Sequence, residues 1–126
     1  MYRSMMQVYI KESDKALDFY QRAFDAKVIC DFRNEDNTVG HAELDIYGQV
    51  LAICELREEE TITGNTMQFC LHLGEGSEAI VKKAYEHLKE DCIRLTAPIT
   101  GPGECPWSPC LFGLIDKYGV NWCIYV

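Results

Sequence analysis

The stretch Gln7-Val8-Tyr9-Ile10 returns later in the chain as Gln68-Phe69-Cys70-Leu71, and this repeat decides the fold. Further matches follow in the same order and at similar spacing: Ala16-Leu17 with Ala79-Ile80, Ala23-Phe24 with Ala84-Tyr85, and Tyr47-Gly48 with Tyr118-Gly119. Each match is weak alone, but four in one order indicate an internal duplication. We therefore expect a single domain over residues 1–126 that is built from two modules, about 1–57 and about 66–126.

Each module is expected to contain a strand, a helix and three further strands. Met5–Ile10 is apolar and β-prone, and Ser13 or Asp14 can cap a helix that runs to about Phe24. The other expected strands are 27–32, 39–46 and 50–56 in the first module, and 66–73, 92–97, 110–115 and 120–125 in the second, whose helix is 77–90. One such module covers only one face of its sheet, so two must share a sheet or a core. The fold class is α+β, with two βαβββ modules.

Residues 98–109 hold all four prolines of the chain and are expected to form an irregular loop. Trp107 lies near the end of this segment. A long loop that carries a large aromatic side chain is typical of a lid, so we expect Trp107 to contribute to a ligand pocket.

Composition excludes several classes of function. The chain has 126 residues, 20 acidic against 12 basic, a net charge of −8 and a pI of about 4.8. It lacks the Lys/Arg-rich block that contacts with phosphates need, so no nucleic-acid partner is expected. No apolar stretch reaches the ~18 residues of a membrane span, and acidic residues soon after Met1–Ile10 argue against a signal peptide. We expect a soluble, cytoplasmic protein.

The seven cysteines are an odd number and follow no secretory segment, which predicts reduced thiols. Four of them lie in apolar runs that read as strands, where a thiol packs as a small hydrophobe: Cys30, Cys54, Cys70 and Cys123. Cys105 and Cys110 belong to the proline-rich segment or adjoin it, and are expected to be the most exposed thiols. Their redox state is left open.

The residue pattern resembles the vicinal oxygen chelate superfamily of glyoxalases, bleomycin-resistance proteins and dioxygenases, and within it the PhnB-like branch. The first helix, 13–26, is similar to the family pattern A-x-x-F-Y-x-x-x-F-G-A, and His41-Ala42-Glu43-Leu44 resembles its third strand. The segment 113–122 resembles the closing signature G-x-x-x-D-P-x-G-x-x-W, with Lys117 where the family usually has proline. The resemblance implies mixed sheets curved around a concave pocket, and a homodimer.

In metal-dependent members, the first and fourth strands of each half supply the ligands of a divalent ion. The family-equivalent positions here are Met5, Glu55, Gln68 and Cys123. Only Glu55 is an unambiguous ligand for a hard ion, whereas such sites normally combine histidine with carboxylate. No cofactor is therefore predicted, and a divalent metal is the less favoured alternative.

Strand alternation provides other candidates for the site. His41 and Glu43 alternate with the apolar Ala42 and Leu44, so both are expected to face the pocket, opposite Glu55. His41, Glu43 and Glu55 are accordingly the candidate acid–base residues, and the preferred alternative is that His41 and Glu43 merely line a wet concave surface. The expected pocket residues are Gln7, His41, Glu43, Ile53, Glu55, Gln68, Trp107 and Cys123.

Three functions remain open at this point. The preferred one is the binding of a small, partly apolar molecule in a pocket without the standard metal site. The alternatives are a divalent-metal-dependent lyase, isomerase or dioxygenase, and a degenerate member that serves interaction or scaffolding. Whether the chain is an enzyme, and what it binds, are not decided by the sequence.

Overall fold

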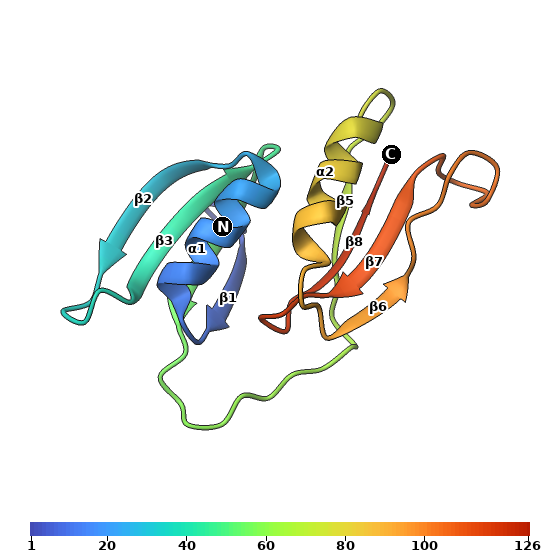
Figure 1. The fold of residues 1–126 in the computed structure, drawn as a ribbon. Helices are drawn as coiled ribbons and strands as arrows, with labels where there is room; N and C mark the ends of the chain where they lie inside the picture. The colour runs from blue at the N-terminus through green and yellow to red at the C-terminus, as the bar shows by residue number, and fades with distance from the viewer. The chain divides into compact units, whose positions relative to one another are not determined.

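The computed structural model describes all 126 residues, which form two compact units, Met1–Ile62 (unit 1) and Thr63–Val126 (unit 2) (Figure 1). Unit 1 contains β1 (Met6–Ile10), α1 (Ser13–Phe24), β2 (Lys27–Arg33), β3 (Val39–Ile46) and β4 (Gln49–Glu55). Unit 2 contains β5 (Phe69–His72), α2 (Glu78–Leu88), β6 (Arg94–Ala97), β7 (Leu111–Ile115) and β8 (Asn121–Tyr125). The predicted α+β class and βαβββ order are confirmed, with element ends shifted by at most three residues.

Both units have the same sheet topology. The strand order is β1-β4-β3-β2 in unit 1 and β5-β8-β7-β6 in unit 2. In each sheet the first strand pairs in parallel with the fourth, and the other pairs are antiparallel. The helix crossover after the first strand accounts for the parallel pair, because parallel strands cannot be joined by a tight turn.

The register of unit 1 is set by the turn between β3 and β4. Tyr47 and Gly48 both have positive φ, 59° and 91°, as a two-residue type I′ hairpin turn requires. Ile46 therefore pairs with Gln49, and Glu43 with Ala52 further along the hairpin. This turn decides which side chains of the two strands share a face.

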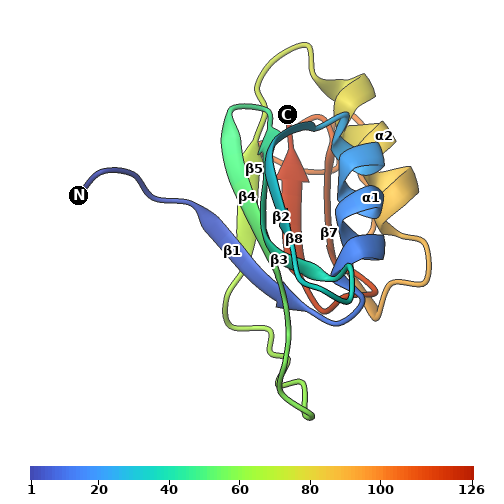
Figure 2. The ribbon, with the colours of Figure 1, turned by 90° about the vertical axis from the view of Figure 1, so that its left-hand side faces the viewer.

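Helix α1 packs on one face of the first sheet and forms the core of unit 1 with it (Figure 2). Ala16, Leu17 and Tyr20 are buried on α1 and recur at helical spacing, while Leu44 and Leu51 are buried beneath them. Helix α2 covers the second sheet in the same manner, and its Tyr85 packs edge-on against Phe112 of β7. Neither helix has the length and apolar character that a membrane span requires.

Several expectations about cysteine exposure are wrong: the exposed thiol is Cys70, while Cys105 is half-buried and so is Cys30. Cys110 is buried, at 2% exposure, and its backbone is hydrogen-bonded: its carbonyl accepts from Val126 N–H, and its N–H donates to Ser108 Oγ. Cys70 is exposed rather than packed in the core, because it lies on the face of β5 opposite α2. Cys54 is buried, as expected.

Candidate functional site

The face of the first sheet that does not contact α1, here the open face of unit 1, carries two rows of side chains. Neighbouring strands place Tyr9, Cys54, His41 and Phe32 in one row, running β1, β4, β3, β2. The second row follows the same strands and consists of Gln7, Ala52, Glu43 and Cys30. In the first row Cys54 and His41 occupy the middle, with an exposed aromatic ring at either end.

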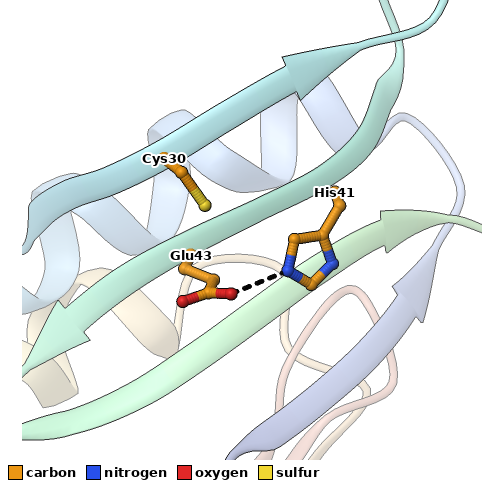
Figure 3. Close-up of side chains that lie close together, drawn as sticks. All are labelled: Cys30, His41 and Glu43. Carbon is orange, nitrogen blue, oxygen red and sulfur yellow. Dashed lines mark hydrogen bonds and ion pairs between the residues drawn. The ribbon is translucent and has the colours of Figure 1, made fainter.

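Glu43 is the centre of this arrangement. Its side chain is buried, and both carboxylate oxygens accept hydrogen bonds from Arg3, at 2.8 and 2.9 Å. His41 Nε2 lies 2.8 Å from Glu43 Oε2 (Figure 3). The Arg3 hydrogen bonds first, and the one from His41 second, lower the pKa of Glu43 to about 2. The carboxylate is therefore ionised and fixed in position by two donors.

His41 also contacts a thiol through its other ring nitrogen. Its Nδ1 lies 3.7 Å from Cys54 Sγ, within the range of a hydrogen bond to sulfur. Burial raises the pKa of the Cys54 thiol, so the protonated form is favoured there. With Nε2 donating to Glu43, Nδ1 is free to accept from the Cys54 S–H. His41 is thus held between a carboxylate and a thiol.

Glu55 does not belong to this cluster, and its expected position opposite His41 and Glu43 is wrong. Glu55 lies on the face of β4 that carries α1, where its Oε1 accepts from Ser13 N–H at 3.0 Å and from Ser13 Oγ–H at 2.8 Å. Ser13 Oγ in turn accepts from Val39 N–H at 2.7 Å. Glu55 thus supplies a hydrogen-bond acceptor to the N-terminus of α1, whose N-cap residue makes no side-chain hydrogen bond.

Ile53 is likewise displaced from the expected pocket. It is fully buried and pairs with Ala42, on the same face as Leu44 and Leu51. The error has one cause: β4 is apolar on both faces, so its composition gives no orientation. The two-residue turn at Tyr47-Gly48 contains the missing information, since Ile46 pairing with Gln49 brings His41 beside Cys54.

The site residues expected in unit 2 lie as follows. Gln68 Nε2 donates to Asn121 Oδ1 at 3.2 Å, and Cys123 is the register neighbour of Cys70. Burial, and next the Cys70 thiol, raise the pKa of Cys123 to about 11. Trp107 is 70% exposed, in a segment without regular strands. Its contribution to a pocket stays a prediction.

Sequence reasoning did not select Arg3, Cys30 or Cys54. Arg3 precedes β1 and reaches Glu43, forty residues away in the chain, so no local pattern reveals it. The apolar run around Cys30 predicts a core position, but a bulge between Val28 and Cys30 in β2 brings it opposite Glu43, where it is half-buried. Bulges redirect side chains and leave little trace in a sequence.

The family's standard divalent site does not fit the residues present. Glu55, the one hard-ion ligand among the four equivalent positions, serves α1 instead. Met5 offers a thioether, Gln68 an amide already bonded to Asn121, and Cys123 a thiol whose pKa is raised by burial. This set lacks the histidine and carboxylate ligands that such an ion needs.

Two βαβββ units with the same sheet topology define the class of glyoxalase-like proteins. The chain belongs to the glyoxalase/bleomycin resistance protein/dioxygenase superfamily, whose family model matches residues 4–123. No curated protein gives a significant sequence match.

Solved structures agree with this class. A PhnB protein from Bacillus cereus has a TM-score of 0.76 and 22% identity, with 98% of each chain covered. The protein PA1353 from Pseudomonas aeruginosa has a TM-score of 0.76 and 15% identity, with 99% of this chain and 97% of that one covered. The fosfomycin resistance protein FosX from Listeria monocytogenes has a TM-score of 0.69 and 14% identity, covering 98% and 91%. At these identities the likeness establishes the fold.

Proposed function

We propose that this protein binds a small, partly apolar molecule on the open face of unit 1, without the standard divalent ion of the superfamily. The observation that carries the proposal is the row Tyr9, Cys54, His41, Phe32. Tyr9, whose hydroxyl accepts from Gln7 Nε2–H, is 58% exposed and Phe32 is 66% exposed, so two accessible aromatic rings flank a fixed polar centre. Ligand sites typically combine apolar and aromatic lining with a few well-placed polar groups.

The polar centre favours a ligand that carries a hydrogen-bond acceptor. Both carboxylate oxygens of Glu43 already accept hydrogen bonds, from Arg3 and His41, so a donor group on the ligand would gain little there. Arg3 has five N–H donors, of which two bond Glu43, and its side chain is partly exposed. A ring with a carboxylate or carbonyl group therefore matches this surface better than a ring with an ammonium group.

The relatives provide independent support. The family description includes bleomycin resistance, and one structural neighbour is a fosfomycin resistance protein, both named for small molecules. A homodimer, expected from the resemblance, stays a proposal. Light scattering after size exclusion tests it, because a dimer has twice the chain mass of 14.4 kDa.

Binding can be tested with probes that share one ring and differ in the polar group: benzoate, benzamide, phenol and benzylamine. In ¹H–¹⁵N spectra, we expect benzoate and benzamide to shift amides of β1 to β4, with dissociation constants of about 1 mM, as is usual for fragments of this size. Phe32→Ala should weaken these shifts. Ile93→Ala, which removes a similarly exposed apolar side chain in unit 2, should leave them unchanged.

Two results would refute the proposal. One is the absence of probe-dependent shifts in the strands of unit 1. The other is a set of shifts that Phe32→Ala and Ile93→Ala reduce equally, since this would indicate non-specific adsorption to exposed apolar side chains.

A further inference from the structure

Three potential metal ligands gather on the open face of unit 1: the Cys30 thiol from β2, and the His41 imidazole and Glu43 carboxylate from β3 (Figure 3). Their ligand atoms all lie within 4.8 Å of one another. We propose that Cys30, His41 and Glu43 bind one zinc-like divalent ion. The site uses none of the four family-equivalent positions, and it does not depend on the proposed small-molecule function.

The donor set selects the class of ion. Thiolate and imidazole suit zinc and similar borderline ions, whereas magnesium and calcium require oxygen ligands throughout. Around tetrahedral zinc, bonds of about 2.0–2.3 Å place ligand atoms about 3.3–3.8 Å apart. The three donor atoms already meet this spacing to within about 1 Å. Cys30 would bind as the thiolate, releasing its proton to solvent, and together with Glu43 would balance the charge of a divalent ion.

Three protein ligands leave a fourth position open. His41 is about one-third exposed and Cys30 is half-buried, so this position faces the surface rather than the core. Structural zinc sites are closed by four protein ligands, while sites that bind water or a substrate keep one position free. The geometry therefore describes an open site.

Cys54 has a positioning role in this proposal. His41 Nε2 faces Glu43, so Nε2 is the nitrogen that would bind the ion, and the ring proton must then reside on Nδ1. Nδ1 lies 3.7 Å from Cys54 Sγ, which can accept that proton's hydrogen bond. Metal-binding histidines generally donate their second N–H to such an acceptor, which fixes the ring orientation.

Arg3 opposes the ion. It bonds both oxygens of Glu43 and supplies the positive charge that balances the buried carboxylate. An incoming cation must take one of these oxygens and tolerate the guanidinium beside it. Arg3→Gln removes this positive charge and is therefore expected to tighten metal binding.

The test is a titration of reduced, chelator-treated full-length protein with Co²⁺, followed by competition with Zn²⁺. We expect one equivalent per chain, a near-ultraviolet thiolate-to-cobalt charge-transfer band, and displacement of Co²⁺ by Zn²⁺. Cys30→Ser should abolish the band, and His41→Asn should weaken binding more than tenfold. Ile93→Ala, which removes an exposed apolar side chain of unit 2, should bind the ion normally.

Other thiols provide the matched control. Cys70 and Cys123 are register neighbours in unit 2, and their double replacement by serine should leave the cobalt band intact. Cadmium-113 NMR of the wild-type protein identifies thiolate coordination independently, should Cys30→Ser fail to fold. The proposal is overturned if no equivalent binds, if the band disappears with Cys70 and Cys123 replaced, or if Glu55→Ala removes the ion from an otherwise folded protein.

Discussion

Ser13 connects three elements of unit 1, and its replacement tests the structural assignment of Glu55. Ser13 is fully buried; its Oγ–H donates to Glu55 Oε1 at 2.8 Å, and its Oγ accepts from Val39 N–H at 2.7 Å. Ser13→Ala removes a hydrogen bond to a charged group, which contributes about 1.5–3 kcal/mol, and leaves a buried N–H unpaired at about 1–3 kcal/mol. Because such terms overlap, we expect a loss of about 3 kcal/mol in the free energy of unfolding.

Ser77, at the start of α2, is the matched control. Its Oγ–H donates to the Gly74 carbonyl at 2.5 Å, and this carbonyl also accepts from Ser77 N–H at 3.3 Å. Ser77→Ala therefore removes a neutral hydrogen bond but leaves the Gly74 carbonyl bonded to the backbone, so the free energy of unfolding should fall by about 1 kcal/mol. The structure thus predicts a threefold difference between two substitutions of the same type at the start of the two helices.

Urea denaturation followed by circular dichroism measures both effects. With an m value of about 1.5 kcal/mol/M, Ser13→Ala should lower the midpoint by about 2 M, and Ser77→Ala by less than 1 M. Hydrogen exchange should show lost protection at the Val39 amide. Equal midpoints for the two variants, or full protection at Val39 in Ser13→Ala, would refute the assignment of Glu55 to the N-terminus of α1.

Three further predictions concern individual contacts. Trp122 Nε1–H donates to Asp116 Oδ2 at 2.9 Å. In Asp116→Asn the amide N–H₂ would face this N–H donor, so the free energy of unfolding in urea should fall by about 2 kcal/mol. The fall should be much smaller in a Trp122→Phe background, which lacks that donor. Burial raises the pKa of Tyr47 to about 12 in the folded protein, against about 10 in the unfolded chain. Its contribution to stability is therefore complete below pH ~10 and is lost as the pH rises from ~10 to ~12. Tyr47→Phe should flatten the fall in Tm over that range. A Cβ added at Gly113 would lie 2.8 Å from Thr96 Oγ1, so Gly113→Ala should cost about 1 kcal/mol, a loss that Thr96→Ala relieves.

Local patterns were sufficient to predict the elements of this fold. The spacing of Ala16, Leu17, Tyr20 and Phe24 predicts α1, and these residues are buried along one face of the observed helix. The clean alternation of polar and apolar residues in β3 predicts a strand with one face toward the helix, and Leu44 and Ile46 are fully buried there. In both cases the spacing of the apolar residues matches the repeat of the secondary structure that they form.

Which residues meet at the site depends on how distant segments of the chain pair with one another. Glu55 follows a strand that is apolar on both faces, so only the hairpin register could orient it. Arg3 precedes β1 and reaches Glu43 on β3, although β4 lies between these two strands in the sheet, and the bulge in β2 directs Cys30 toward the same carboxylate. Such contacts follow from register, bulges and chain crossings, none of which has a short-range signature.

The duplication separates the residues that make the fold from those available for function. In unit 2, Phe112 packs against α2, so Leu111, Gly113 and Ile115 occupy the open face of β7. In unit 1 the same face of β3 carries His41 and Glu43. The two units therefore keep one backbone plan and one helix-facing core, while the third strand of each differs in its opposite face. Because alternate residues of a strand face opposite sides, the open face can change chemistry without disturbing the core. The polar cluster of unit 1 is thus a property of this chain rather than a requirement of its fold.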